Sequence, residues 1–230
     1  MGNKMSFFVV ILFICFISTV SAEETWKITS LDWQPYSGAD MATQGNSIQK
    51  LRELLKKEGI TLIVEFYPWK RAQETAKKSD YVGYFPAWPE EVGEGFFTSD
   101  PVDWSSIDVL KKTETKLLFN TIDELFQNYK VGYVDTYKYP DSITMAIKTY
   151  PDNAKGSQNE ISLAKMLSKE RFSAALTDSN VMLYAAQKEG ISNIETFGDS
   201  LMRKELVIAF RNGDDNKKRS ELLKRLLNQN

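Results

Sequence analysis

The sequence has no histidine and a single cysteine, Cys15. Cys15 lies in an N-terminal apolar run that we expect to be removed, so the mature chain has neither side chain. Thiol nucleophiles, Ser-His triads and nearly all zinc sites are therefore excluded. Carboxylate chemistry, Ser-Lys chemistry and oxygen-ligated metal sites stay open. Since no disulfide can hold the mature chain together, its stability must come from a packed core.

The chain also has little net charge, −2 from 29 basic and 31 acidic residues. No basic stripe occurs outside the C-terminal segment, so we do not expect nucleic acid as a partner. That segment is predicted to be a basic amphipathic helix with Leu222, Leu223, Leu226 and Leu227 on one side. We interpret it as a helix docked on the core with a solvated basic face, the alternative being a membrane-surface helix.

The N-terminus has the features of a secretory signal peptide. Lys4 precedes the apolar run Phe7 to Val20, and small residues end at Ala22. The pattern predicts a signal peptide over 1–22 that is cleaved after Ala22. An uncleaved anchor is the alternative, but the run is short for a span of about 20 residues. An exported chain of this length without disulfides favours the bacterial periplasm.

The first half of the mature chain alternates strands and helices. The predicted strands are 26–31, 61–67 and 81–85. One predicted helix is capped by Ser47 and ended by Gly59, and the other runs from Trp69 to Lys78. This β-α-β-α-β order predicts a parallel sheet with right-handed crossovers.

The second half repeats the alternation. Capping-box patterns at 121–124 and 157–160 predict two helix starts, and the second helix is expected to turn Ile161, Ala164 and Leu167 inward. Ser179 is expected to cap a third helix that ends at Gly190. The predicted strands of this half and of the chain's end are 107–110, 130–134, 172–177, 191–197 and 206–210.

The last strand and helix have no hairpin partner in the second half, so we expect them to return to the first. We therefore predict an α/β protein with two lobes, 23–111 plus 205–230 and 112–204. Each lobe would be a mostly parallel sheet flanked by helices. Two crossing segments, near 107–112 and 203–210, would form a hinge that closes around a ligand.

Tyr81 to Trp104 combines seven aromatic residues, three prolines and five acids with no Lys or Arg. The strand that begins it is expected to break at Pro86 and Pro89 and to restart near Phe96. Aromatic residues beside Pro and Gly are typical of a rigid loop that presents ring faces. The loop is either a surface element that covers a core edge or one wall of a small-molecule cleft.

Ligands of parallel sheets bind beyond the carboxyl ends of the strands. The loops at these ends carry aromatic, acidic and hydroxyl side chains, together with one arginine. Such a set predicts a site for a small polar, even cationic, organic molecule. The candidate ligand-binding residues are Asp32, Trp33, Tyr36, Trp69, Arg71, Tyr84, Phe85, Trp88, Asp135, Thr136 and Asp178.

Four motifs in this order, WQPYSG, YPWKRA, FFTSDPV and FSAALTD, span nearly the whole mature chain. In order and spacing the chain resembles extracellular solute-binding proteins of the polar amino-acid type, and YPWKRA resembles the orphan branch of that family. The resemblance implies a two-lobed periplasmic-binding-protein fold of type II, monomeric and without a cofactor. It would close on one amino acid or similar solute for an inner-membrane ABC importer.

The resemblance places Asp178 where the family binds the α-amino group of its ligand, although an acid there also suits an ordinary helix start. It places Val92 where the family has an Arg that binds the ligand carboxylate, and no Arg occurs from Gln73 to Glu170. Arg71 either substitutes for it or stacks on Trp69. A cation, a polyamine-like solute or a neutral solute therefore fits better than a standard amino acid.

Three functional hypotheses follow. The first is a solute-binding protein without enzymatic activity. The second is a lyase or dehydratase on the same fold, with Glu90 or Glu91 as general acid or base beside Asp178. The third is a protein with a degenerate cleft that serves a membrane sensor or complex.

Overall fold

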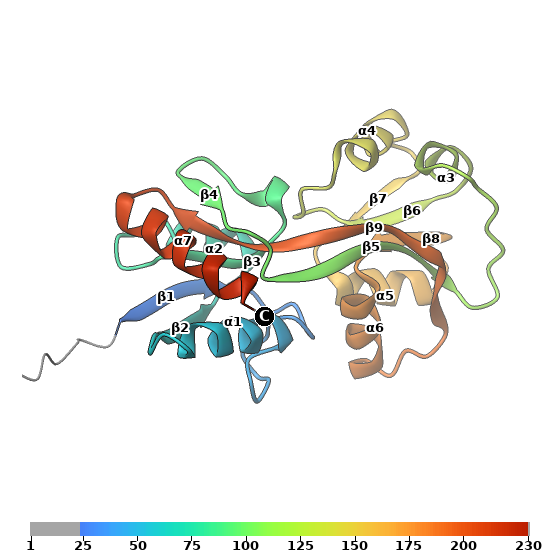
Figure 1. Cartoon of the computed structure of the whole chain (residues 1–230). Helices are drawn as coiled ribbons and strands as arrows, with labels where there is room; N and C mark the ends of the chain where they lie inside the picture. Colours follow the sequence, from blue (N-terminus) through green and yellow to red (C-terminus); the bar gives the residue numbers. More distant parts are fainter. Residues whose placement is uncertain (1–23, 230) are drawn as a thin grey trace, which may run out of the picture.

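Two long antiparallel strands, β5 (Asp103–Lys112) and β9 (Ile194–Arg211), run through the molecule and connect its two lobes (Figure 1). Their pairing extends from Asp103 opposite Leu206 to Lys112 opposite Ile194. The computed structural model describes residues 24–229, so the predicted signal peptide lies outside the described residues. Within that range no helix is both long and apolar enough to cross a membrane.

The first lobe is built on the sheet order β2-β1-β3-β9, with β4 on the other side of β9. Strands β1 and β2, and β1 and β3, are parallel, whereas β9 runs antiparallel to β3 and β4. The elements of this lobe besides β9 are β1 (Thr25–Ser30), α1 (Asn46–Lys56), β2 (Thr61–Phe66), α2 (Trp69–Thr75), β3 (Gly83–Ala87), a 3₁₀ turn (Pro89–Glu91), β4 (Phe96–Thr98) and α7 (Asp214–Asn228).

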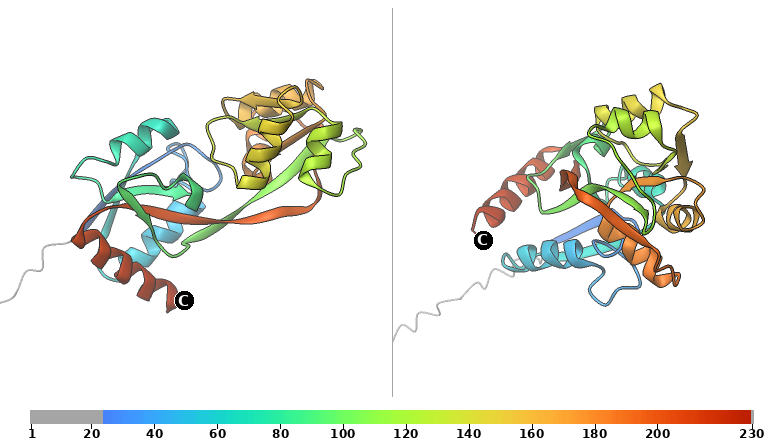
Figure 2. Two further views of the ribbon diagram at one scale, coloured as in Figure 1. Left: turned by 90° about the horizontal axis from the view of Figure 1, so that it is seen from above. Right: turned by 90° about the vertical axis from the view of Figure 1, so that its right-hand side faces the viewer.

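The second lobe continues the sheet in the order β5-β8-β6-β7. Strand β6 is parallel to both β7 and β8, and β8 is antiparallel to β5. Figure 2 shows from two further directions how the β5–β9 ribbon spans both lobes. The elements of this lobe are α3 (Ile122–Asn128), β6 (Val131–Val134), α4 (Asp141–Thr149), β7 (Ala154–Ser157), α5 (Glu160–Ser168), β8 (Ala174–Thr177) and α6 (Ser179–Lys188).

This architecture confirms the predicted two-lobed α/β fold with two crossing segments. The parallel pairs lie inside each lobe, and the antiparallel pairs are those made by β5 and β9. The two strands predicted at 191–197 and 206–210 are one continuous strand, β9. The residue limits assigned to the lobes from sequence stay a prediction.

The strand that opens the aromatic stretch does not break at Pro86, as the sequence suggested, but runs on to Ala87. The pairing of β3 with β9 shifts register between Tyr84 and Ala87. Proline is tolerated at such an irregularity because no ladder hydrogen bond is required from its nitrogen. The predicted restart near Phe96 is confirmed as β4.

Three helix starts differ from the sequence-based expectation. The residue before α1 is Gly45, and the Ser47 hydroxyl instead donates to Asp103 Oδ2 at 2.7 Å. Asn159, not Ser157, caps α5 by accepting from Ser162 N, and Asp178, not Ser179, caps α6 by accepting from Val181 N. At α5 and α6 the neighbouring polar side chain accepts from a free N–H group of the first turn, whereas α1 begins after Gly45 without a side-chain cap.

Helix α5 also presents a different face from the one expected. Leu163, Ala164 and Leu167 are buried, whereas Ile161 is exposed. Helix α4 and strand β7 were not predicted from the sequence. Strand β7 reads Ala-Lys-Gly-Ser, which has little β propensity, and it forms because it pairs in parallel with β6.

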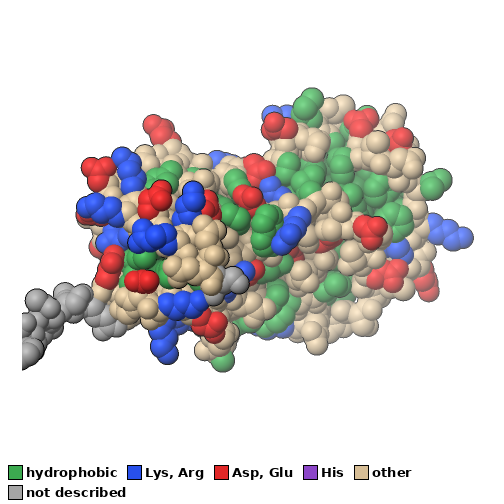
Figure 3. Space-filling model, in the orientation of Figure 1, with side chains coloured by type: hydrophobic (Ala, Val, Ile, Leu, Met, Phe, Trp, Pro, Cys, Tyr) green, Lys and Arg blue, Asp and Glu red, His purple; other side chains and the backbone are tan. Residues whose placement is uncertain are grey.

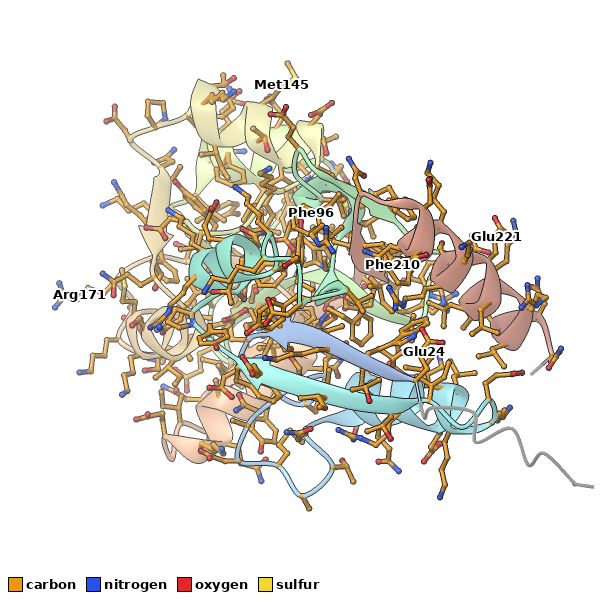
Figure 4. The ribbon with its side chains drawn as sticks, turned by 90° about the vertical axis from the view of Figure 1, so that its left-hand side faces the viewer. Glu24, Phe96, Met145, Arg171, Phe210 and Glu221 are labelled. Atoms are coloured by element: carbon orange, nitrogen blue, oxygen red, sulfur yellow. The ribbon has the colours of Figure 1, made fainter. Side chains whose placement is uncertain are left out.

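The C-terminal helix α7 docks on the first lobe, which confirms the core-docked interpretation. Leu223 and Leu226 are fully buried, and Arg219 pairs with Glu24 at 2.9 Å. Figure 4 shows Glu24 beside α7, with Glu221 on the outer side of the helix. In Figure 3 charged side chains of both signs cover this lobe, while apolar side chains gather over the lobe that carries α3 and α4.

Candidate functional site

The two lobes touch through a set of hydrogen bonds around Tyr36 and Asp178. Tyr36 Oη donates to Asp178 Oδ2 at 3.0 Å, and Asn180 Nδ2 donates to Tyr36 Oη at 3.0 Å. Asp178 also accepts from Ser106 N at 2.9 Å and, as the cap of α6, from Val181 N at 3.1 Å. Asp178 thereby ties together the first lobe, the β5 ribbon and the start of α6.

A second contact between the lobes is centred on Glu160, the first residue of α5. Its Oε1 accepts from Trp33 Nε1 of the first lobe at 3.2 Å, and from Tyr137 Oη at 2.7 Å and Thr177 Oγ1 at 3.3 Å. Three donors on one oxygen hold this side chain in place. The sequence pattern suggested a capping role for Glu160, but its side chain faces the junction between the lobes.

The first lobe contributes another buried acid, Glu91, at the end of the 3₁₀ turn. Its Oε1 accepts from Trp69 Nε1 at 2.9 Å and its Oε2 from Trp88 N at 3.2 Å. The backbone of Lys138 in the second lobe also acts on this carboxyl and favours its charged form. Groups of both lobes therefore influence Glu91.

Aromatic rings fill the space between these acids. Trp88 makes edge-on contacts with Trp33 at 6.2 Å, Tyr137 at 5.6 Å and Tyr139 at 6.0 Å between ring centroids. The Trp88 indole also donates to Ser105 Oγ at 2.9 Å. Edge-to-face packing at these separations is the favoured geometry for aromatic pairs. The loop 81–104 therefore presents Trp88 to the opposite lobe, and its assignment as the wall of a ligand cleft stays a prediction.

Two spaces lie at this junction. The inner cavity is lined by Trp33, Trp69, Trp88, Tyr137 and Glu91 together with apolar neighbours, and its volume of about 10 Å³ suits about one water. The outer groove has a volume of about 430 Å³ and is bounded by both lobes. Its walls are residues 31–32 and 66–70 of the first lobe and residues 136–137 and 158–160 of the second.

The electrostatics of the junction are acidic. Burial raises the pKa of Glu91 to about 7, although the hydrogen bonds from Trp88, Trp69 and Lys138 act in the opposite direction. Burial also raises the pKa values of Glu160 and Asp178 from their ordinary values. Among residues 24–229 no Lys or Arg forms an ion pair with any of these three acids.

Val92, which stands at the position of the missing arginine, is half-buried in the first lobe. Two basic residues lie at the junction. Lys70 lines the outer groove, and the ammonium of Lys204 of β9 lies 5.6 Å from the Trp88 ring centroid and pairs with Glu90. Arg71 is exposed and lies over the Tyr67 ring at 5.1 Å, so it stacks on a different ring from the predicted Trp69.

The structure gathers part of the predicted set at the junction. Trp33, Tyr36, Trp69, Trp88 and Asp178 take part in the hydrogen bonds and ring contacts described above. Asp32 and Thr136 line the outer groove. Their assignment as ligand-binding residues stays a prediction.

The other predicted residues lie away from both spaces. Phe85 is fully buried in the first-lobe core. Tyr84 is buried behind Glu91 and donates to its carbonyl at 2.9 Å. Asp135 is exposed at the end of β6. The sequence shows that a residue follows the carboxyl end of a strand, but it does not show whether the side chain faces the junction, the core or solvent.

Sequence reasoning missed Tyr137, Glu160 and Asn180 as junction residues, and it proposed Glu91 only as a catalytic group. Tyr137 directly follows the predicted Asp135 and Thr136, so strand-end position was a usable signal for it. Glu160 carried no such signal, because an acid in a first helical turn is expected on electrostatic grounds alone. No cluster of potential metal ligands occurs within residues 24–229.

No protein-family model matches this chain, and no curated protein matches it. Solved structures of similar fold do match it. A histidine kinase sensor domain with similarity to periplasmic binding proteins has a TM-score of 0.72 at 16% identity, covering 90% of this chain and 92% of that one. An ancestral arginine-binding protein bound to arginine has a TM-score of 0.70 at 16% identity, covering 89% and 91%. The GluR0 ligand-binding core with L-glutamate has a TM-score of 0.70 at 18% identity, covering 91% and 94%.

These similar structures are domains of the periplasmic-binding-protein type, and one of them is a sensor domain. An ancestral amino-acid-binding protein described as a precursor of cyclohexadienyl dehydratase is also similar, with a TM-score of 0.65 at 20% identity. At such identities the likeness concerns the fold. The chain has the two-lobed fold of the periplasmic binding proteins.

Proposed function

We propose that this chain is a periplasmic binding protein, without enzymatic activity, that captures a small polar solute between its two lobes. The observation that carries the proposal is the outer groove of about 430 Å³, whose walls come from both lobes. Asp32, Trp69 and Thr136, all selected from the sequence as ligand-binding residues, line it. A volume in this range suits one amino-acid-sized or amine-sized molecule.

The hydrogen bonds across the junction support a mechanism of lobe closure. Tyr36 to Asp178 and Trp33 to Glu160 each join one lobe to the other. Both bonds must break when the lobes separate, and both re-form when the lobes close on a solute. Closure would bury the solute against aromatic walls, and the β5–β9 ribbon, the only pair of strands shared by both lobes among the described residues, would bend.

The predicted contact of Asp178 with a ligand ammonium belongs to this cycle. In the closed arrangement the two carboxylate oxygens already accept from Tyr36, Ser106 and Val181. Asp178 would therefore meet a ligand only after Tyr36 withdraws. An inner-membrane ABC importer is the partner we propose for the loaded form, and a monomer is the expected state.

Binding is tested by measuring the melting temperature and the tryptophan fluorescence of the protein with amino acids, amines, peptides and sugars. We expect one class to raise the melting temperature and change the fluorescence, because Trp33, Trp69 and Trp88 surround the junction. The absence of a response to every class would refute solute binding.

One observation favours a second candidate function, that of a sensory or docking protein whose closed form needs no ligand. The inner cavity is lined by the protein's own rings, which leave room for about one water. Small-angle X-ray scattering of the ligand-free protein distinguishes the two. An open form that becomes compact with solute supports capture, whereas a closed form that never changes supports the sensory role.

A further inference from the structure

The inner cavity combines aromatic rings with a carboxyl group. Trp33, Trp69, Trp88 and Tyr137 line it, and Glu91 is its acidic residue. We call these five residues the Glu91 cage. The ring contacts of 6.2 Å and 5.6 Å that Trp88 makes with Trp33 and Tyr137 bring three of the four aromatic residues together.

Glu91 is buried, and no Lys or Arg of residues 24–229 forms an ion pair with it. The hydrogen bonds that its carboxyl accepts come from the Trp69 indole and the backbone N–H of Trp88. Lys204 approaches the cage, but its ammonium pairs with Glu90. A carboxylate offers about four acceptor positions, so about two remain for a ligand.

Rings and carboxylate favour the same kind of ligand group. The face of an indole or phenol ring attracts a cation, and more strongly when water is excluded. A carboxylate in a buried site adds a charge-assisted hydrogen bond to a positive donor. An anionic or uncharged head group would gain neither interaction there.

The size of the cavity selects among cations. A volume of about 10 Å³ suits about one water. A primary ammonium group has a similar size, and its three N–H donors match a carboxylate acceptor. Three methyl groups on the nitrogen would require the rings to move apart.

The inner cavity adjoins the outer groove. Leu31, Trp69 and Tyr137 line both spaces. Asp32 and Glu160 give the groove two acidic side chains, against one basic side chain, Lys70. A solute lying in the groove can therefore extend one end between Trp69 and Tyr137 toward Glu91. The cavity takes the head of such a solute, and the groove takes its body.

We propose that the solute is an organic cation with a primary ammonium head that enters the Glu91 cage and pairs with Glu91. The inference rests on the proposed capture of a solute between the lobes, and it names the chemical class of that solute. Asp178 fits this role less well, because it is fully buried, lines neither space and already accepts three hydrogen bonds.

The test uses three probes that differ only in their head group. Isothermal titration calorimetry would compare 5-aminopentanol, its N-acetyl derivative and its N,N,N-trimethyl derivative. We expect the primary amine to bind and the other two to bind at least tenfold more weakly. Equal binding of the acetylated or trimethylated probe would overturn the assignment of the cage to a primary ammonium.

A matched pair of variants separates the cage from general charge. Glu91→Gln should weaken binding of the amine at least tenfold, whereas Glu94→Gln, the same change on an exposed residue of the same loop, should not. Unchanged affinity in a folded Glu91→Gln protein would refute the inference. The head-group comparison uses the unaltered protein, so it remains decisive if the Glu91 variant does not fold.

The same titrations extended to sugars, amino acids and dicarboxylates distinguish the two proposals. A neutral or anionic solute that binds between the lobes while the amine does not would uphold solute capture and overturn the ammonium cage. No binding by any solute would refute solute capture and the ammonium cage with it.

Discussion

The phenol of Tyr36 and the carboxylate of Asp178, 142 residues apart in the sequence, form a 3.0 Å hydrogen bond that joins the two lobes. Asn180 donates to the same phenol oxygen, so Tyr36 is held from two directions by the second lobe. The pair couples the closed arrangement to the start of helix α6.

Replacing Tyr36 with Phe should favour separation of the lobes. The change removes a hydrogen bond to a charged group, and we expect the free energy of unfolding to fall by about 1.5–3 kcal/mol. The radius of gyration in solution should rise if the bond holds the closed form. Differential scanning calorimetry and small-angle scattering measure the two effects.

Tyr150→Phe is the control for this prediction. It also removes a phenol–carboxylate bond, to Asp123 at 2.8 Å, but that bond is exposed and lies within one lobe. We expect a smaller loss of stability than for Tyr36→Phe and no change in radius, because water screens an exposed bond. Equal radii for the wild type and Tyr36→Phe would show that Tyr36 does not hold the lobes together.

Glu91 should make stability depend on pH. Because burial raises its folded-state pKa from 4.5 to about 7, the folded protein binds more protons than the unfolded chain between these values. The stability from the protonated carboxyl is fully present below pH 4.5 and is lost as pH rises through about 7. The loss is at most about 3 kcal/mol. Urea denaturation at about pH 5 and about pH 8, on either side of the raised pKa, measures it.

Glu91→Gln should reduce this pH dependence, and Glu94→Gln should not. Other ionisable groups face Glu91, namely Glu90 on its own turn, Tyr137 and Tyr139 from the second lobe, and Lys204 of β9. Burial raises the pKa values of both tyrosines further above this pH range, and Glu90 pairs with Lys204. If the Glu91→Gln variant kept the full pH dependence of the wild type, the effect would be assigned to Glu160 and Asp178.

Gly83 lies in the antiparallel pairing of β3 with β9, where the backbone of β9 leaves no space for a side chain. A Cβ atom would stand 2.0 Å from the carbonyl oxygen of Ala209. We expect Gly83→Ala to lower the free energy of unfolding by about 1–3 kcal/mol, because the strands must move apart. Chemical denaturation measures the change.

Gly93→Ala is the comparison for Gly83. No atom lies within 4 Å of a Cβ built at Gly93, so this variant should stay within about 0.5 kcal/mol of the wild type. Similar losses in the two variants would mean that the close approach of β3 and β9 is not the cause.

Asp108 fixes the ribbon that connects the lobes. Its carboxylate accepts from Ser106 Oγ at 2.6 Å, from Ser179 N at 3.0 Å and from the Ser200 hydroxyl. Asp108→Ala leaves three donors of the ribbon and of α6 without their partner, so we expect a loss of about 2–3 kcal/mol. Asp100→Ala, at an exposed position of the loop before β5, should change the unfolding free energy by less than about 0.5 kcal/mol. Equal unfolding midpoints for the two variants would contradict the role given to Asp108.

The alternation of helices and strands was readable from the sequence because it depends on short-range patterns. The apolar stripe of α1, the capping pattern of α3 and the run of β-branched and apolar residues in β2 each lie within one element. Their order was enough to predict two α/β lobes joined by crossing strands. Strand β7 was not readable, because its stability comes from pairing with β6 rather than from its own residues.

For the site, the sequence determined which loops end at the same edge of each sheet, and so it selected Trp33, Tyr36, Trp69, Trp88 and Asp178. Only the tertiary structure decided which way each side chain points. From the sequence, Glu160 is an acid at the start of a helix and Phe85 is an aromatic residue at the end of a strand. In the structure, Glu160 faces the other lobe and Phe85 is buried in the core. The physical reason is that strand-end position follows from local chain geometry, whereas orientation across the junction depends on hydrogen-bond partners far away in the sequence, such as Trp33 and Glu160, which are 127 residues apart.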